Sequence, residues 1–276
     1  MKIGVIGCGV VGEAHAKLCE AFGHRVFRND RVPKDADNYY GKSDLKKHCE
    51  MIFLCLPTPS TSNGISMKVF DEVMPGLEGF KGLVVIKSTV LPTTCDSYSA
   101  LYNLRIAHNP EFLTEANAVV DAMQPDKIII GRKEEDKELV DMLIDLYSPF
   151  IKKGVEVFIT NTVTSELSKY ASNCFLAMKV SFANEWFDIC KQWKHVDYDV
   201  IKNSLYADKR IGDTHLDVKQ TRYWNGHCFP KDTVAMHNMC KLLNIDDKML
   251  HATIMKNTTY FGSVGTWWDK DGKQLI

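Results

Sequence analysis

The sequence predicts an α/β protein: a Rossmann-like parallel sheet domain, followed by an all-helical domain with one long helix. In the first half of the chain, short apolar and β-branched runs alternate with helical stretches, as in a parallel sheet covered on both faces. A glycine-rich turn follows the first of these runs. Residues 161–193 contain neither glycine nor proline, which predicts the long helix. We therefore expect a sheet domain over residues 1–160 and a helical domain over residues 161–276.

Composition narrows the class of protein. The chain has 276 residues, enough for two domains, and its net charge of -1 gives no sign of a nucleic-acid or membrane partner. No apolar run approaches the roughly 20 residues of a membrane-spanning helix. The nine cysteines include no C-x-x-C pair, and several lie inside apolar runs. This usage is typical of reduced thiols, so we expect a cytoplasmic protein.

The predicted elements follow in order. The first 16 residues are rich in glycine and lack a small-residue cleavage pattern, so we expect a strand and turn there, not a signal peptide. Strands are predicted by apolar runs at 2–7, 24–30, 51–57, 83–90, 104–109 and 127–132, and the alternating pattern ends after 155–160. Helices are predicted at 13–23, 68–80, 134–150, 161–193, 198–208, 231–244 and 246–262, with Asn161 or Thr162 as the cap of the long one.

The turn reads Gly7-x-Gly9-x-x-Gly12, directly between a strand and a helix. In that context the first glycine makes the turn, the second lets the backbone approach a pyrophosphate, and the third lets the helix pack on the strand. The next strand ends in Asp30, whose carboxylate suits ribose hydroxyls and therefore NAD over NADP, although Arg28 and Arg31 flank it. The alternative is a glycine turn that binds no cofactor.

On the long helix Glu166, Lys169 and Asn173 share one face. They form either a solvated stripe with a Glu–Lys pair, or a site in which Lys169 and Asn173 hold a substrate hydroxyl and stabilise negative charge on oxygen. Asn173 lies among apolar residues, which favours partial burial.

Two strand ends carry further polar candidates. Ser88 and Thr89 end an apolar run, where ligands of open parallel sheets bind. Glu111 follows the next run and is a candidate water-activating base, whereas Glu115 is either a site residue or an acid that suits a helix dipole.

Cys228 is the candidate nucleophile. It precedes Pro230, which suits the first position of a helix, and both a helix amino terminus and the nearby Lys231 stabilise a thiolate. Asp232 lies in the first turn of this helix, where it suits a capping acid. Taken singly, each of these residues is equally well explained as structural. The spacing of the nearby histidines and Cys228 fits no common metal site, so no metal is expected.

Six segments in this order resemble the UDP-glucose/GDP-mannose dehydrogenase family: "IGVIGCGVVGEAHA", "CLPTP", "IKSTV", "NPEFLTEA", "ELSKYASNCFLAMKVSFANE" and "HCFPKD". The resemblance runs from residue 1 to about residue 245. Members of this family oxidise the C6 alcohol of a nucleotide sugar to a carboxylate with two NAD molecules and one water.

The resemblance implies catalytic roles. Cys228 forms a thiohemiacetal and then a thioester, and Lys169 and Asn173 stabilise oxyanions. Asp232 supports acid–base steps or orders a water, and Glu111, with Thr89 nearby, activates water for hydrolysis.

The resemblance also implies binding residues and a partner. The substrate is a nucleotide sugar, UDP-glucose above all, and the long helix forms a homodimer across which Arg210 reaches a substrate phosphate. The implied cofactor-binding residues are Gly7, Gly9, Val10, Val11, Gly12, Asp30, Pro57, Thr58, Ser88, Thr89 and Glu115. The implied substrate-binding residues are Glu111, Phe112, Leu113, Lys169, Asn173, Arg210, Tyr223, Trp224, Asn225 and Gly226.

The sequence departs from the family pattern in two ways. Usual members carry a third, UDP-binding domain, which this sequence lacks, so we expect a short form. The family has a G-F-G-G loop before the cysteine, whereas this chain has Tyr223-Trp224-Asn225-Gly226. If that loop needs positive φ, tyrosine is a poor replacement for glycine.

Two other functions remain open at this point. A two-electron dehydrogenase of the 3-hydroxyacid type shares the Rossmann-plus-helices plan and a helical Lys-x-x-x-Asn pair, but needs no cysteine. An inactive NAD-binding homologue is the second alternative.

Overall fold

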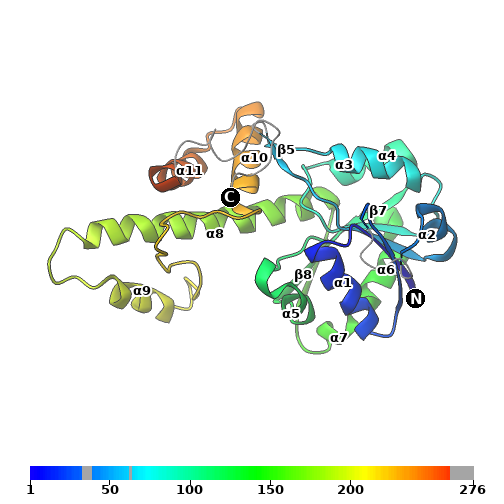
Figure 1. Cartoon of the computed structure of the whole chain (residues 1–276), viewed down its shortest axis with the longest axis horizontal. Helices are drawn as coiled ribbons and strands as arrows, with labels where there is room; N and C mark the ends of the chain where they lie inside the picture. Colours follow the sequence, from blue (N-terminus) through cyan, green and yellow to red (C-terminus); the bar gives the residue numbers. More distant parts are fainter. Residues whose placement is uncertain (33–38, 62–63, 262–276) are drawn as a thin grey trace. The chain divides into compact units, whose positions relative to one another are not determined.

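The computed structural model describes residues 1–32, 39–61 and 64–261 (Figure 1). The chain forms two compact units. The first consists of Met1–Thr58 and Met67–Lys169, and the second of Pro59–Ser66 and Tyr170–Ile276. The predicted helix 246–262 ends with Gly262, which lies outside the described residues. Helix α8 (Thr162–Cys190) runs from one unit into the other.

The first unit contains a seven-stranded sheet in the order β2-β1-β3-β6-β7-β8-β9. All neighbouring strands are parallel except β7 and β8, which meet in an antiparallel pair at His108 and Gly131. The order reverses at β1, so ligands are expected outside the carboxyl ends of β1 and β3. The strands are β1 (Lys2–Ile6), β2 (Arg25–Asn29), β3 (Met51–Leu54), β6 (Leu83–Ile86), β7 (Arg105–His108), β8 (Lys127–Gly131) and β9 (Glu156–Thr160). This confirms the predicted Rossmann-like sheet.

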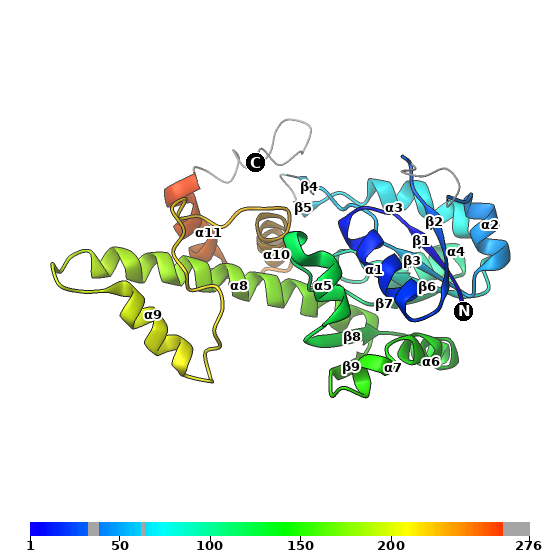
Figure 2. The ribbon, with the colours of Figure 1, turned by 60° about the horizontal axis from the view of Figure 1, so that its bottom comes forward.

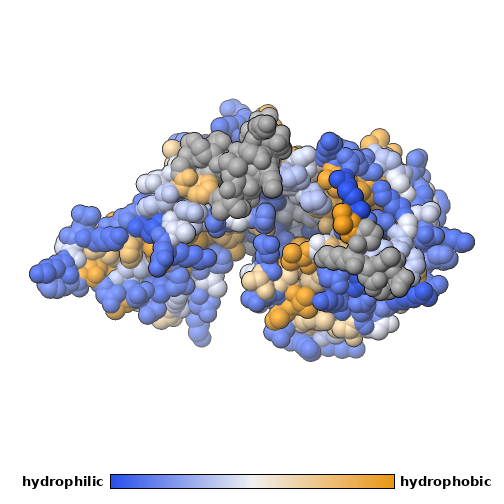
Figure 3. All heavy atoms as spheres, in the orientation of Figure 1, coloured by the Kyte–Doolittle hydropathy of each residue, from blue (hydrophilic) through white to orange (hydrophobic). Residues whose placement is uncertain are grey.

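Helices cover both faces of this sheet (Figure 2). One apolar core lies beneath α1 (Val10–Ala21), α5 (Ala118–Met123), α6 (Lys137–Leu146) and α7 (Ser148–Ile151). The other lies beneath α2 (Lys42–His48), α3 (Lys68–Val73) and α4 (Thr94–Tyr102). Because β1, β3 and β6 are buried on both faces, they consist of nearly continuous apolar residues. The outer side of α5 carries two exposed apolar residues, Val119 and Val120. An apolar patch is visible at this helix in Figure 3.

Proline explains where two predicted helices are shorter than expected. The predicted helix 68–80 is α3 followed by the 3-10 turn η2 (Met74–Leu77), which contains Pro75. The predicted helix 134–150 is divided into η4 (Glu134–Asp136), α6 and α7, and Pro149 lies in the first turn of α7. Proline has no amide N–H and starts helices more readily than it continues them.

The second unit is built on the rest of α8, with α9 (Tyr198–Ala207), α10 (Phe229–Leu242) and α11 (Lys248–Phe261). Asn161 caps α8, as predicted, by accepting the Thr164 amide at 2.8 Å. A two-stranded hairpin, β4 (Ser60–Thr61) with β5 (Gly64–Ile65), packs against α10. One small apolar core joins α8, α10 and α11, and a second joins α8 to α9.

Candidate active site

The glycine turn at the end of β1 has the geometry expected for a dinucleotide site. Gly7 has φ +90°, and a Cβ on Gly12 would lie 1.9 Å from the Gly7 carbonyl oxygen. The turn therefore requires glycine at both positions, so that α1 can start close to β1. A Cβ on Gly9 would meet no atom within 4 Å, which leaves open space in front of its backbone.

Asp30 stabilises this turn from the end of β2. Its carboxylate accepts the Cys8 amide at 2.6 Å and the Val32 amide at 3.1 Å. The acid of the dinucleotide fingerprint therefore lies against the glycine turn, where ribose hydroxyls bind in Rossmann domains.

The two arginines that flank Asp30 have partners of their own. Arg28 pairs with Glu13 at 3.1 Å and with Glu20 at 2.6 Å, and Arg31 pairs with Glu72 at 2.8 Å. Because two carboxylates hold the largely buried Arg28, its guanidinium group is not a free site for a 2′-phosphate, whereas the exposed pair of Arg31 is weak. This supports the preference for NAD that Asp30 predicts.

Polar groups link the ends of β3 and β6. The Ser88 hydroxyl donates to the Leu56 carbonyl at 2.7 Å, and the Thr58 hydroxyl donates to the Thr89 carbonyl at 2.9 Å. Thr58 and Thr89 are buried, whereas Pro57 is exposed. Of the two valines in the turn, Val10 is 48% exposed and Val11 is half-buried.

Glu111 and Lys169 form a nearly buried ion pair in the first unit. The Lys169 Nζ lies 3.3 Å from Glu111 Oε1 and donates to the Glu111 carbonyl at 2.6 Å. The other carboxylate oxygen accepts the Leu113 amide at 2.7 Å. The Phe112 ring lies 5.1 Å from Lys169 Nζ and 4.4 Å from Lys127 Nζ, two cation–π contacts. Glu111 is thus held both through its side chain and through its backbone.

Glu166, Lys169 and Asn173 are 1%, 3% and 5% exposed, so the interpretation as a solvated stripe is wrong. Lys169 pairs with Glu111, and the Glu166 carboxylate instead accepts the Thr93 and Cys95 amides at 2.7 and 2.9 Å. Burial raises the pKa of Glu166 more than these hydrogen bonds lower it. Glu166 therefore caps the amino terminus of α4.

Glu115 is exposed at the start of the short turn η3 (Glu115–Asn117). The neighbouring Thr114 bonds through its amide and hydroxyl to Asp121, at 2.7 and 2.6 Å.

In the second unit a buried polar cluster lies at the first turn of α10. The Asn173 amide donates to Asp232 Oδ2 at 2.5 Å, and Lys231 Nζ donates to Asp232 Oδ1 at 2.5 Å. Asp232 is fully buried, and Cys228 is the N-cap residue of the same helix. The sequence led us to expect Lys231 beside the thiol. In the structure its ammonium group pairs with the Asp232 carboxylate. The structure thus brings Asn173 and Asp232 together, one turn of α10 from the cysteine.

The loop before the cysteine does not need glycine at the two substituted positions. Positive φ occurs at Arg222 (64°) and Gly226 (84°), but not at Tyr223 or Asn225. Trp224 is buried, its amide and carbonyl bond to the Asn257 side chain at 2.8 and 3.0 Å, and its indole N–H donates to Ser181 at 2.9 Å. Tyr223 contacts the Phe261 ring, at 4.6 Å between centroids.

Sequence reasoning missed Arg222, which ties this loop to α8 and α11. Its guanidinium donates to Asn184 Oδ1 at 2.8 Å, Asp188 at 2.5 Å and the Tyr260 hydroxyl at 2.9 Å. Burial would raise the pKa of Asp188, but hydrogen bonds from Tyr260, Arg222 and Lys256 lower it to about 2. A single arginine in a polar loop carries no sequence signal for this role.

Arg210, the expected phosphate contact, is exposed and pairs with Asp208 at 2.6 Å. A carboxylate two residues away therefore neutralises its charge in the isolated chain.

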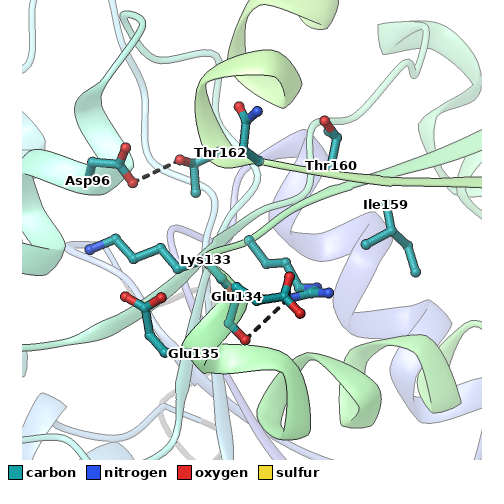
Figure 4. Close-up of a pocket in the computed structure, with 9 residues that line it drawn as sticks. Asp96, Lys133, Glu134, Glu135, Ile159, Thr160 and Thr162 are labelled. Carbon is teal, nitrogen blue, oxygen red and sulfur yellow. Dashed lines mark hydrogen bonds and ion pairs between the residues drawn. The ribbon is translucent and has the colours of Figure 1, made fainter.

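A pocket of about 390 Å³ lies elsewhere in the first unit (Figure 4). Three carboxylates and two cations line it, and Arg132 is already paired with Glu134 at 2.9 Å. This balance does not favour an anionic nucleotide. The lining residues, none of them a predicted site residue, are Asp96, Arg132, Lys133, Glu134, Glu135, Ile159, Thr160, Asn161 and Thr162.

Within residues 1–32, 39–61 and 64–261, no cluster of three or more His, Cys, Asp or Glu side chains is suited to hold a metal ion. In the same part of the chain, no helix combines the length and apolarity needed to cross a membrane.

The mostly parallel sheet, the glycine turn and Asp30 define the first unit as a Rossmann-type dinucleotide-binding domain. Residues 34–151 match the NAD binding domain of the UDP-glucose/GDP-mannose dehydrogenase family, and residues 163–259 match the central domain of that family. The chain belongs to the UDP-glucose/GDP-mannose dehydrogenase family.

Individual relatives agree with this assignment. The chain is 35% identical to UDP-glucose 6-dehydrogenase of Rickettsia felis, over 93% of this chain and 64% of that protein. It is 36% identical to UDP-glucose 6-dehydrogenase of Rickettsia bellii, over 93% of this chain and 67% of that protein. A solved UDP-glucose dehydrogenase from Pyrobaculum islandicum superposes with a TM-score of 0.84 at 26% identity, over 94% of this chain and 68% of that one. The chain thus spans about two thirds of the length of these proteins.

Proposed function

We propose that this protein catalyses the NAD-dependent, four-electron oxidation of the C6 alcohol of a nucleotide sugar to a carboxylate. The proposed substrate is UDP-glucose and the proposed product UDP-glucuronate. The relatives that carry the name UDP-glucose 6-dehydrogenase support this choice of sugar. Bound NAD would supply the chemistry of a two-electron oxidant, accepting one hydride in each of two steps.

The proposed reaction begins with oxidation of the alcohol to an aldehyde, which releases one proton and one hydride. The Cys228 sulfur then adds to the aldehyde carbon and forms a thiohemiacetal. Loss of a second hydride from that carbon gives a thioester. Lys169 and Asn173 would stabilise the negative charge that develops on the substrate oxygen during these steps.

Water then cleaves the thioester. Glu111 would take a proton from the water as its oxygen attacks the carbonyl carbon, the carbon–sulfur bond breaks, and the thiolate of Cys228 leaves. Asp232, held between Asn173 and Lys231, would support proton transfer at the cysteine or order a water. The sum is one alcohol, two NAD and one water converted to one carboxylate, two NADH and three protons.

The observation that carries this proposal is the contact of Asn173 with Asp232 at the start of the helix that Cys228 caps. A two-electron 3-hydroxyacid-type dehydrogenase needs a helical Lys–Asn pair, but it has no use for a cysteine and a buried carboxylate beside it. The candidate catalytic residues Glu111, Lys169, Asn173, Cys228 and Asp232 are all present in the sequence, which argues against an inactive homologue.

We also propose that the protein is a cytoplasmic homodimer that pairs through α8. None of the nine cysteines, all of which lie among the described residues, forms a disulfide bond, as expected in a reducing compartment. Large apolar side chains on α8 are exposed at spacings of seven, four and three residues, which places them on one helix face. They are Phe175, Phe182, Trp186 and Ile189, which are 54%, 45%, 39% and 38% exposed. Sedimentation of the purified protein tests this, and a monomer would contradict it.

The test of the reaction is to incubate the protein with NAD and a panel of nucleotide sugars, and to count the NADH formed per sugar consumed. We expect two NADH per UDP-glucose. One NADH per substrate would point to the two-electron reaction, and no turnover despite NAD binding would point to an inactive homologue. A Cys228→Ser variant that still formed the carboxylate at an unchanged rate would rule out the thioester.

A further inference from the structure

Lys87 is a buried cation that the proposed chemistry does not use. It directly follows β6, is 6% exposed, and its hydrogen bonds within the described residues go to neutral groups. Its Nζ donates to the Asn109 carbonyl at 3.1 Å and to Asn109 Oδ1 at 2.8 Å, with the Tyr147 hydroxyl at 3.5 Å. Burying an ammonium group against neutral acceptors is costly, so such a residue needs an explanation.

The groups that Lys87 contacts are themselves fixed. The Asn109 amide donates to the Ile129 carbonyl of β8 at 2.8 Å, and the Tyr147 hydroxyl donates to Asn109 Oδ1 at 2.5 Å. Every polar atom of the Asn109 side chain therefore has a partner within the first unit. Lys87, Tyr147 and β8 together hold Asn109 in one orientation.

This arrangement reaches Glu111 through a short and stiff piece of backbone. The carbonyl that Lys87 binds belongs to the peptide bond between Asn109 and Pro110, and the proline ring fixes the next φ. Few freely rotating bonds then separate the fixed peptide from Glu111. Lys169 binds the carbonyl of Glu111 itself, two residues beyond that of Asn109, at 2.6 Å. Two lysines thus hold the backbone on either side of the carboxylate.

We propose that Lys87 is a positioning residue for Glu111 and that it thereby sets the rate of thioester hydrolysis, an inference that rests on the proposed function. Lys87 acts through Asn109 and Pro110 and does not touch the substrate. Its loss should impair the step that needs the Glu111 carboxylate more than the two hydride transfers, because a displaced general base loses its alignment with the attacking water.

The test compares wild type with Lys87→Met, a variant of similar length without the ammonium group. NADH formation is followed by rapid mixing with UDP-glucose and NAD, and acid-quenched protein is weighed by mass spectrometry. For Lys87→Met we expect a burst of about two NADH per active site and then a steady rate reduced about 10- to 100-fold. The quenched protein should carry a covalent acyl group, lost when Cys228 is also replaced. NAD affinity should stay unchanged.

Two further variants sharpen the test. Tyr147→Phe keeps the ammonium group but removes one donor to Asn109, so it should show the same NADH burst with a smaller reduction of the steady rate. If Lys87→Met does not fold, Tyr147→Phe alone tests the proposal. Lys133→Met is the matched control, since that lysine bonds to the Ser99 hydroxyl at 3.0 Å, and it should show no burst. Equal slowing of hydride transfer and hydrolysis in Lys87→Met and Tyr147→Phe would overturn the inference. Failure of wild type to produce two NADH per sugar would instead overturn the proposed function.

Discussion

Glu111 and Cys228 lie in different units, and the two units hold them by different means. Glu111 follows a strand of the sheet, and its backbone is fixed by two buried lysines that bind successive parts of one short segment. Cys228 follows a loop with no regular structure, and hydrogen bonds from Trp224 and Arg222 to helices α8 and α11 fix that loop. In the first unit the sheet and two buried lysines hold the segment, whereas the helical unit depends on a few side chains in the loop.

The difference has a physical basis. A strand end inherits the position of its neighbours in the sheet, and the two lysines then orient the residues that follow it. A loop between helices has no such support, and its buried backbone groups need side-chain partners. We therefore expect substitutions in the loop to affect reactivity of the cysteine, and substitutions at the strand ends to affect either folding or one chemical step.

The largest effect is expected for Asp232→Asn, which removes the charge that Lys231 and Asn173 bind without changing the shape of the side chain. We expect kcat to fall about 100- to 1,000-fold, because an acid–base group is lost next to the cysteine. Steady-state NADH formation measures it, with thermal unfolding as a check on the fold. Asp217→Asn, an exposed carboxylate that pairs with Lys202 at 2.7 Å, is the control and should change the rate less than twofold. Equal rates for Asp232→Asn and wild type would remove Asp232 from the mechanism.

Substitutions at two glycines of the turn distinguish an effect on stability from an effect on NAD affinity. In Gly12→Ala the new Cβ meets the Gly7 carbonyl oxygen at 1.9 Å, so we expect the free energy of unfolding to fall by about 1–3 kcal/mol. In Gly9→Ala the Cβ meets open space, so stability should change by less than about 0.5 kcal/mol. NAD affinity should nevertheless fall in Gly9→Ala, because the methyl group occupies the space that a pyrophosphate needs. Urea unfolding and NAD titration measure the two quantities, and unchanged NAD affinity in Gly9→Ala would contradict this assignment.

Arg222→Met tests the loop. Without the guanidinium group the segment before Cys228 loses its bonds to Asn184, Asp188 and Tyr260, and we expect kcat/KM to fall about 10-fold. The rate of Cys228 alkylation by iodoacetamide should change as well, and Arg222→Lys should restore part of it. Lys202→Met, which removes a cation that pairs with Asp199 and Asp217, is the matched control. The Lys202→Met control should be alkylated at the wild-type rate. If Arg222→Met and Arg222→Lys are alkylated at that rate as well, Arg222 does not position the cysteine.

The same contrast explains what the sequence predicts well. The strands of the sheet, the glycine turn and the cap at Asn161 follow from local pattern, because burial on both faces and backbone geometry restrict residue choice. The Asn173–Asp232 contact and the Arg222 bonds join residues 59 and at least 34 positions apart, and no local pattern encodes such pairs. The role of Glu166 in capping α4 was missed for the same reason.

The smallest effect concerns the charge on Lys87. Burial lowers the pKa of Lys87 to about 8, although Cys55, Glu111 and Cys19 act in the opposite direction and Lys169 adds to the lowering. The nearby His15 is neutral, since burial and Lys87 lower its pKa, and burial raises the pKa of Tyr147.

An unfolded lysine keeps its proton up to a pKa of about 10.4. Between pH 8 and pH 10 the unfolded chain therefore binds a proton that the folded chain has released, and the contribution of this group to stability rises with pH. We expect the free energy of unfolding of wild type, relative to Lys87→Met, to increase by about 1 kcal/mol from pH 8 to pH 9. Urea unfolding of both proteins at pH 7, 8 and 9 measures this. A constant difference would show that Lys87 keeps an ordinary pKa, and that the buried segment before Glu111 is more accessible to water than its contacts imply.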